Sequence, residues 1–285
     1  MMRGLSDKFY ECFKEGYLNA LIQRVRKDKD LDFQIREDSI NIYYKGNSLL
    51  KLDADKKVTI AKKFTLGLDI PLYLDCEAAT ESFIKAIPLI KDNIIRYANE
   101  SKKTLEAEYE QLLIRANNLE KRNASEYFII DRQYQTGKEN RFDLTGFFWD
   151  RDNREKGQTV PLTFLEVKFA LNNDIKEVHE QIKRYYDYVK NHTSELAEEY
   201  EKVFKTKVEL GLLNQDDNRM EALKTLNFSK NLNEYEFIIV LVDYNPNSTL
   251  LKEALNELRK LEFASQIRIF NAGFAMWKQN VKPIL

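Results

Sequence analysis

The 285-residue chain has few of the residues that build several common kinds of site. Its two cysteines, Cys12 and Cys76, are isolated in the sequence, so they form neither a disulfide framework nor a zinc site. Its two histidines, His179 and His192, are too few for a metal cluster built from histidine. A metal-dependent activity would therefore rely on aspartate and glutamate.

Glycine and proline are also sparse, with 9 and 5 residues, and charged residues make up 32% of the chain. This composition is typical of a folded, helix-rich protein and gives no sign of a low-complexity chain. With 43% hydrophobic and 12% aromatic residues, the chain is able to build a full core.

Long hydrophobic runs are missing as well. No stretch approaches the roughly 18 uncharged apolar residues that indicate a membrane-spanning helix. Charged residues at Arg3, Asp7 and Lys8 come too early for a secretory signal peptide. We therefore expect a cytoplasmic protein with no membrane partner.

An excess of one charge sign is absent. The 45 basic and 46 acidic residues leave a net charge of −1. A strongly basic chain would favour nucleic acid on composition alone, and this chain lacks that signal. Residues 127–190 are balanced too, with 11 basic and 11 acidic side chains, so a nucleic-acid groove would have to be a local patch.

The first hundred residues change their hydrophobic period along the chain. Residues 8–27 have helical spacing, and residues 32–62 contain four short alternating runs separated by turn residues. A connector and a helix over 77–98 follow. The pattern predicts a module over residues 1–99 that combines helices with an antiparallel β-meander.

The rest of the chain, residues 100–285, predicts a second domain of α/β class. Its sheet would be mixed, because three strands follow one another and later strands alternate with helices. The charged, helical stretch at about 193–230 reads as an insertion. The expected elements, in order, are a helix over 102–121, strands over 127–135, 141–149 and 160–170, a helix over 174–190, a strand over 237–243, a helix over 248–261 and a strand over 266–271.

An acid and a base lie two residues apart in the third of these strands. Side chains alternate across a strand, so Glu166 and Lys168 share one face with Leu162 and Phe164. The strand is apolar on both faces, and a buried charge is costly unless it meets an opposite charge or a metal. The alternative is that Glu166 and Lys168 form an ordinary ion pair on a solvated edge.

Asp143 lies in the neighbouring predicted strand. If the two strands pair, Asp143 and Glu166 come within reach of one cation. Two close carboxylates suit Mg²⁺, which prefers oxygen ligands and retains several waters. Lys168 would then orient and deprotonate a water, or stabilise charge that develops on a phosphate. The alternative for Asp143 is a salt bridge with Arg141.

The sequence Asp143…Glu166-Val167-Lys168 resembles the PD-(D/E)XK nuclease superfamily. The resemblance covers roughly residues 100–275 and implies a restriction-endonuclease-like core, which is a mixed central sheet flanked by helices. It also implies hydrolysis of phosphodiester bonds with Mg²⁺, for which Mn²⁺ substitutes.

Two further residues strengthen this resemblance. Gln181 and Tyr185 are four apart on one helical face and match the Gln-x-x-x-Tyr motif of the RecB-like and Cas4-like nucleases. In those families the two side chains line the active site, and this resemblance gives them a catalytic role here. Tyr185 also fits the apolar stripe of its helix, so a core role is the alternative.

The superfamily commonly supplies a third acidic ligand from the preceding helix or the first strand. Glu120, Glu126 and Asp131 are the candidates in this chain. Asp131 directly follows the apolar run 128–130, so it is the residue that we predict as the additional metal ligand.

These features favour a Mg²⁺-dependent nuclease that acts on DNA, in a bacterial or phage-defence context by resemblance. RNA stays an alternative substrate, and residues 1–99 would contact the substrate, a partner protein or a second copy. One competing hypothesis is a catalytically inactive nuclease fold that binds nucleic acid or serves in assembly. The other is a scaffolding protein whose helices mediate oligomerisation.

Overall fold

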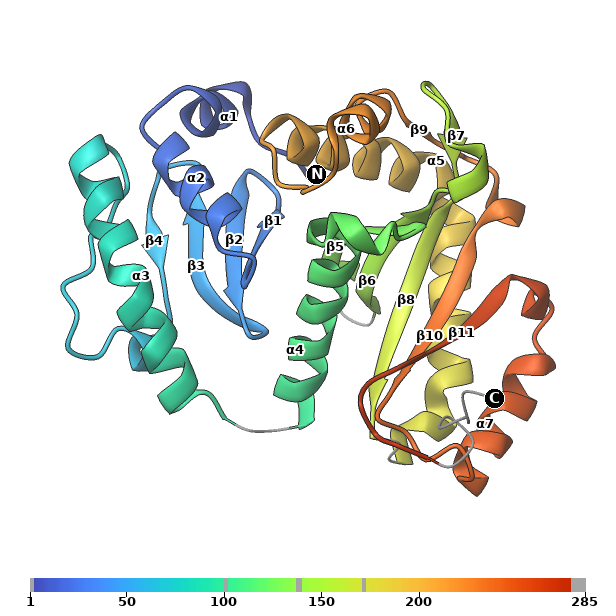
Figure 1. The fold of residues 1–285 in the computed structure, drawn as a ribbon. Coiled ribbons are helices and arrows are strands. Elements are labelled where there is room, and N and C mark those ends of the chain that lie inside the picture. The colour runs from blue at the N-terminus through green and yellow to red at the C-terminus, as the bar shows by residue number, and fades with distance from the viewer. Residues whose placement is uncertain (1–2, 100–101, 137–139, 171–172, 278–285) are drawn as a thin grey trace.

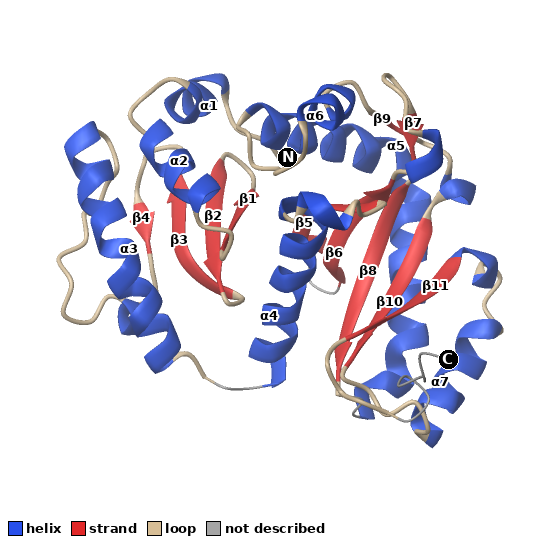
Figure 2. Cartoon of the chain, in the orientation of Figure 1, coloured by secondary structure: helices blue, strands red, loops and turns tan. Residues whose placement is uncertain are grey.

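The described part of the chain contains a four-stranded and a five-stranded β-sheet, with helices packed around them, and a short two-stranded sheet (Figures 1 and 2). The computed structural model describes residues 3–99, 102–136, 140–170 and 173–277. The protein is a mixed α/β structure whose larger sheet contains both parallel and antiparallel strands. None of the helices in these described ranges has the length and apolar character needed to cross a membrane.

The smaller sheet is the predicted meander. Its four strands pair antiparallel in chain order, and helices from the same part of the chain pack around it. The elements are α1 (Asp7–Lys14), α2 (Asn19–Lys27), β1 (Leu31–Ile35), β2 (Ser39–Tyr44), β3 (Asn47–Asp53), β4 (Val58–Thr59) and α3 (Glu77–Tyr97).

The helical pattern over residues 8–27 forms two helices rather than one. The side-chain amide of Asn19 donates to the carbonyl oxygens of Phe13 and Lys14, at 3.0 and 2.7 Å. These bonds satisfy carbonyl groups that the end of α1 leaves without a helical partner. The chain then turns and restarts as α2, so the helical spacing over residues 8–27 corresponds to two helices.

The larger sheet has the order β11-β10-β8-β6-β5. Its first three strands in the chain are antiparallel neighbours, and the later strands run parallel to β8. These strands are β5 (Tyr127–Thr136), β6 (Asn140–Phe148), β8 (Leu162–Phe169), β10 (Glu236–Val242) and β11 (Ile267–Ala272). A mixed sheet flanked by helices was predicted, and the structure confirms that architecture.

Helices cover both faces of this sheet (Figure 1). Helix α4 (Lys102–Ile114), which continues as a π-helical turn (Arg115–Leu119), lies between the two sheets and contacts β8, β5 and β3. Helices α5 (Val178–Glu209) and α7 (Thr249–Arg259) pack on the other side. The two faces of β8 enter two separate apolar clusters, one with Leu162 and Phe164 and one with Leu165 and Val167.

Helix α5 is longer than the predicted helix over 174–190 and continues past a kink at His192. Its second half buries Leu196, Tyr200 and Phe204 in the main apolar cluster. The stretch predicted as an insertion therefore begins inside α5 and contributes to the core. It continues through α6 (Asp217–Leu223) and β9 (Asn227–Phe228), which pairs with β7 (Thr159–Val160).

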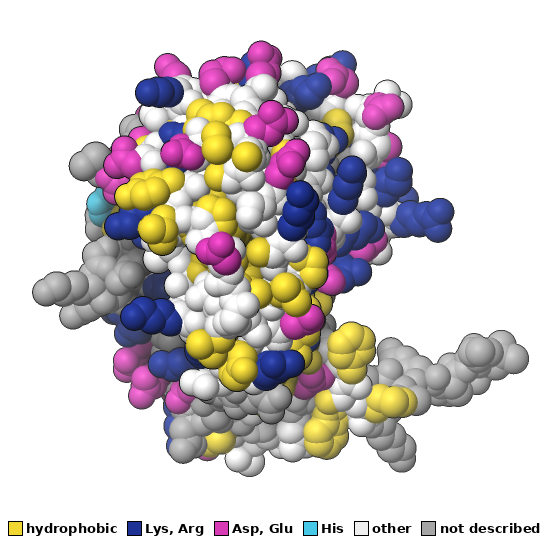
Figure 3. Space-filling model, turned by 90° about the vertical axis from the view of Figure 1, so that its left-hand side faces the viewer, with side chains coloured by type: hydrophobic (Ala, Val, Ile, Leu, Met, Phe, Trp, Pro, Cys, Tyr) yellow, Lys and Arg dark blue, Asp and Glu magenta, His cyan; other side chains and the backbone are white. Residues whose placement is uncertain are grey.

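The outer face that α3 forms exposes several large apolar side chains (Figure 3). Leu89 and Ile95 of α3, and Leu72 in the connector that precedes it, are more than half exposed. Figure 3 shows hydrophobic side chains on this face interspersed with basic and acidic side chains. This face is therefore neither a continuous basic surface nor a single apolar patch.

Buried charges join the meander to the larger sheet. Asp131 of β5 pairs with Arg36 at 2.5 Å and with Arg3, and Arg3 also pairs with Glu199 of α5 at 2.6 Å. Nearby, the ammonium group of Lys207 donates to Gln34 Oε1 at 2.7 Å and to the carbonyl oxygen of Ile130 at 2.6 Å. The two sheets are thus held together by specific polar contacts as well as by apolar packing.

Lys207 makes the stability of this junction depend on pH. Burial lowers its pKa from 10.5 to about 7, and the charges of Arg36 and Arg3 add to the effect, while Asp32 opposes it. Between these two values the unfolded chain holds a proton that the folded chain lacks. The free energy of unfolding should therefore rise with pH across this window.

We predict that this rise is smaller in Lys207→Met than in the unsubstituted protein. Urea unfolding at several pH values between about 7 and 10.5 measures it, and the comparison of slopes removes the contribution of other titrating groups. Equal slopes in the two proteins would show that Lys207 keeps an ordinary pKa when folded.

Candidate active site

The candidate site lies where two neighbouring strands of the larger sheet separate. Strands β6 and β8 pair from Phe147↔Leu162 to Leu144↔Leu165, and the pairing ends there. One residue further along β6, the Asp143 carboxylate accepts a hydrogen bond from the backbone N–H of Val167 at 2.9 Å. The Asp143 carboxylate therefore replaces the next backbone hydrogen bond between β6 and β8. This bond holds the carboxylate beside Glu166.

A pocket of about 330 Å³ opens at this point. Its lining includes all five residues predicted as catalytic, from β6, β8 and α5: Asp143, Glu166, Lys168, Gln181 and Tyr185. The remaining lining residues come mainly from α4 and from the segment that leads into α5. They are Lys103, Glu106, Glu110, Gln133, Arg141, Asp174, Glu177 and Arg184.

Glu166 and Lys168 form a buried ion pair with an Nζ–Oε1 distance of 2.5 Å. The two residues are only 3% and 7% exposed, so the reading as a solvated edge pair is wrong. Burial alone would lower the pKa of Lys168, but the charge and hydrogen bond of Glu166 outweigh it and raise that pKa above 10.5. Lys168 is therefore a cation at neutral pH.

The surroundings of Asp143 make its ionised form unfavourable. Burial, and then the repulsion of the Glu166 carboxylate, raise the pKa of Asp143 well above its ordinary value, although the bond from Val167 opposes them. Arg141, the predicted alternative partner, lies 3.9 Å away and is more than half exposed, so it neutralises Asp143 weakly. Two carboxylates that repel each other in this way favour a cation between them.

Tyr185 and Gln181 project from α5 toward these groups. The Tyr185 hydroxyl lies within hydrogen-bonding distance of Glu166 Oε2 and of the carbonyl oxygen of Arg141. Burial and the Glu166 charge raise the pKa of Tyr185 well above 10, so the hydroxyl keeps its proton and donates it. Gln181 Oε1 is buried in the pocket wall and accepts no hydrogen bond from the described residues.

The donor set fits a divalent cation. Six carboxylates and four cationic side chains line the pocket, so its charge favours a cation. Within the described ranges, no three acidic, histidine or cysteine side chains are grouped as a ready metal site. Mg²⁺ does not require such a group, because it commonly binds through one or two carboxylates, waters and a substrate phosphate.

Asp131, the predicted third ligand, does not reach this pocket. It is fully buried on β5 and makes ion pairs with Arg3 and Arg36 at the junction of the two sheets. Strand β5 is irregular between Ile129 and Asp131, so simple alternation does not give the direction of this side chain. A buried charge in an apolar strand was correctly suspected, but its partners are arginines.

The two other acidic candidates also lie outside the lining of the pocket. Glu120 pairs with Lys29 at 2.9 Å and with Arg115 at 3.5 Å. Glu126 accepts a hydrogen bond from the backbone N–H of Arg151. All three predicted candidates therefore have structural partners elsewhere.

The preceding helix α4 does supply acidic side chains, namely Glu106 and Glu110. Glu110 is 2% exposed, and its Oε2 accepts from Arg132 at 2.8 Å and from Gln133 at 3.2 Å. Burial raises the pKa of Glu110, although Arg132 opposes it. In the sequence, Glu106 and Glu110 are four residues apart, and this spacing places them on one helical face. Such spacing usually marks a solvated helix surface, which is why these residues were missed.

No protein-family model, curated protein or solved structure matches this chain. The assignment of a function therefore depends on the geometry of the pocket and on the motifs that it brings together.

The two roles considered for Asp131 give opposite expectations for Asp131→Asn. As the anionic partner of Arg3 and Arg36, its loss should destabilise the fold by about 3–5 kcal/mol, because it removes the carboxylate that pairs with Arg36 and leaves Arg3 paired with Glu199. Mn²⁺ binding at the pocket should be unchanged. Urea unfolding and calorimetric titration with Mn²⁺ measure the two effects, with Glu166→Gln as the matched variant that should lose Mn²⁺ binding. Loss of Mn²⁺ binding in a stable Asp131→Asn protein would contradict this structural role.

Proposed function

We propose that this protein is a Mg²⁺-dependent nuclease that hydrolyses phosphodiester bonds of DNA. The observation that supports it is the convergence of Asp143, Glu166 and Lys168, together with Gln181 and Tyr185, on one pocket. These five residues are spread over about forty positions of the chain and three elements, so their meeting is not a consequence of local sequence. The pattern that they form resembles the PD-(D/E)XK superfamily.

Asp143 and Glu166 are the residues that would hold the ion. When bound, Mg²⁺ would supply positive charge to the phosphate oxygens and lower the pKa of a water molecule. The two carboxylates are fixed in advance, Asp143 by Val167 and Glu166 by Lys168 and Tyr185. This fixation reduces the reorganisation needed when substrate arrives.

Lys168 has the role of stabilising charge. Its raised pKa keeps the ammonium group protonated at neutral pH, so in the resting state it is a poor base. A fixed cation beside the two carboxylates is suited to the negative charge that develops on a phosphate during hydrolysis. Of the two roles expected from the sequence, the structure supports this one.

Gln181 and Tyr185 act from the α5 side of the pocket. Tyr185 donates to Glu166 and so orients this carboxylate. Gln181 offers a buried acceptor to which no described residue donates, which is costly unless a water or a substrate hydroxyl donates to it. Both residues therefore have a positioning role rather than a role in proton transfer.

The rim of the pocket can receive a nucleic-acid backbone. Lys103, Arg141 and Arg184 are exposed and line its mouth. Contacts of such cations with phosphates supply most of the non-specific affinity of proteins for nucleic acid. A local patch of three cations does not require an excess of basic residues in the chain, whose net charge is −1.

A cleavage assay tests the proposal. Plasmid and single-stranded DNA, with RNA in a parallel reaction, are incubated with the protein in Mg²⁺, Mn²⁺ or EDTA. We expect cleavage that requires a divalent cation, and a loss of roughly 10²-fold or more in Glu166→Gln and in Lys168→Ala. Glu180→Gln and Lys183→Ala are matched controls, because both residues are exposed on α5 and neither lines the pocket.

The controls should cleave at the rate of the unsubstituted protein. Cleavage that survives in Glu166→Gln or Lys168→Ala would contradict the proposed site. Binding of DNA without cleavage under any metal condition would favour the inactive nuclease fold instead.

A further inference from the structure

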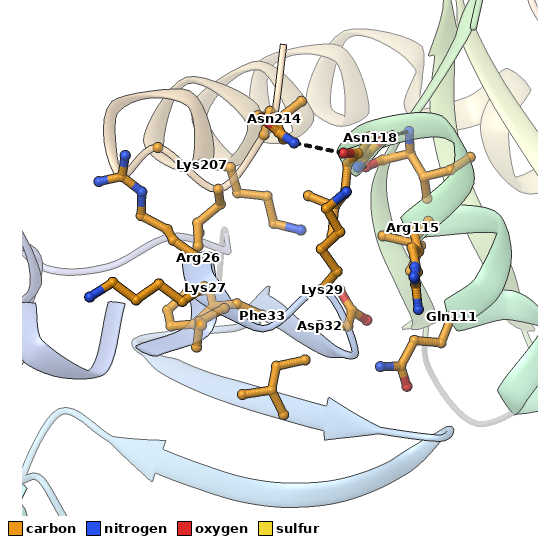
Figure 4. A pocket seen from close by; sticks show the side chains of 18 of the residues that line it. Arg26, Lys27, Lys29, Asp32, Phe33, Gln111, Arg115, Asn118, Lys207 and Asn214 are labelled. Carbon is orange, nitrogen blue, oxygen red and sulfur yellow. Dashed lines mark hydrogen bonds between the residues drawn. The ribbon is translucent and has the colours of Figure 1, made fainter. Parts of the chain in front are cut away.

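A second pocket, of about 350 Å³, lies where the smaller sheet meets the helices of the larger one (Figure 4). Its walls come from α2 and β1 on one side and from α4, the π-helical turn and the end of α5 on the other. It shares no lining residue with the candidate active site. Its volume is within the range of small-molecule binding sites.

Part of the wall is apolar and suits a flat organic ring. The apolar lining residues are Leu31, Phe33, Ile114, Ile129, Phe204 and Leu213. Polar and charged side chains form about half of the lining, and several of them converge on the same space. Figure 4 shows Asp32, Lys29, Lys207 and Arg115 around its centre.

Asp32 presents an acceptor that the described residues leave unsatisfied. The residue is 6% exposed, and its Oδ1 accepts from Gln34 Nε2 at 2.6 Å. Its Oδ2 is buried and has no hydrogen-bond partner, and the nearest cation, Arg132 Nη1, is 3.8 Å away and also lacks one. A buried carboxylate oxygen in this setting favours a ligand that donates an N–H or O–H group.

The other polar groups donate. Lys207 Nζ donates to Gln34 and Ile130, and below its lowered pKa of about 7 it carries a third proton for a ligand. Arg115 pairs with Asp30 and Glu120, and Lys29 pairs with Glu120, all near the pocket mouth. These partners are partly exposed, so an incoming anion is able to compete for the cations.

We propose that this pocket binds a free nucleoside monophosphate. A ligand that satisfies the site must have an apolar ring, an N–H donor and an anionic group, and a nucleotide has all three. The base would lie between the apolar walls with an N–H group on Asp32 Oδ2. The phosphate would lie toward Lys29, Arg115 and Lys207.

The side chain of Arg132 lies between this pocket and the candidate active site. Arg132 directs Nη1 toward Asp32, and its Nε and Nη2 donate to Glu110, at 3.2 and 2.8 Å. Glu110 lines the active-site pocket. A ligand on Asp32 would therefore alter the surroundings of the arginine that holds Glu110.

Calorimetric titration of the full chain in EDTA tests the proposal, because chelation removes divalent ions that could hold a phosphate in the active site. The probes are AMP, GMP, CMP and UMP, with adenosine, ribose 5-phosphate and inorganic phosphate as incomplete ligands. We expect at least one monophosphate to bind roughly tenfold or more tightly than any incomplete ligand, since each lacks a required group. Glu166→Gln should bind the nucleotide equally well, which separates this test from that of the nuclease.

Variants locate the binding. Asp32→Asn, which keeps the shape of the side chain, and Arg115→Ala should each weaken the best nucleotide by roughly tenfold or more, the loss expected for a charged hydrogen bond. Arg122→Ala is the matched control, because Arg122 is exposed in the segment that follows the π-helical turn and does not line the pocket. Thermal unfolding confirms that each variant is folded.

Three results with the mononucleotide probes would overturn the proposal, and a fourth concerns a longer ligand. They are the absence of binding by all four monophosphates, binding that neither Asp32→Asn nor Arg115→Ala weakens, and ribose 5-phosphate that binds as tightly as the nucleotides. A short oligonucleotide that binds through Asp32 and Arg115 where mononucleotides do not would assign the pocket to a nucleic-acid end and would also overturn it.

Discussion

The ion pair between Glu166 and Lys168, with Asp143 beside it, is the constraint on which the architecture of the site depends. Three ionisable groups on two neighbouring strands are costly to bury. Their partners come from other elements: the N–H of Val167 in β8 for Asp143 of β6, and Tyr185 of α5 for Glu166 of β8. Burial, and after it the repulsion between the two carboxylates, raise the pKa of Asp143. A divalent cation would relieve this repulsion, so the cost in the free protein is consistent with a site prepared for a metal.

Strand β5 connects this site with the rest of the molecule. Asp131 and Arg132 are adjacent in it, yet Asp131 pairs with Arg3 and Arg36 whereas Arg132 pairs with Glu110. The first contact fixes the smaller sheet against the larger one, and the second fixes an acidic side chain at the active-site pocket. The meander is therefore joined to the sheet that carries the candidate catalytic groups through buried charges, and the second pocket lies along the same junction.

Much of this site could be predicted from sequence because its spacings are local. Two-residue alternation gave the shared face of Glu166 and Lys168, and a spacing of four gave that of Gln181 and Tyr185. The roles of Asp131 and Glu110 could not be predicted, since their partners are set by tertiary contacts: Arg3 is 128 residues from Asp131, and Arg132 is 22 residues from Glu110. The strands of the larger sheet could be predicted because their apolar patterns are local in the sequence. The length of α5 could not, because its second half is rich in charge and its few apolar residues are buried by tertiary packing.

The central claim is that Asp143 and Glu166 together hold a divalent cation. A crystal of the protein soaked in Mn²⁺, measured for anomalous scattering at a wavelength near the manganese edge, tests it most directly. The account predicts one strong peak between the two carboxylates, in contact with an oxygen of each, and no such peak in crystals of Glu166→Gln. A peak bound elsewhere, or no peak in crystals of a protein that cleaves DNA with Mn²⁺, would contradict it.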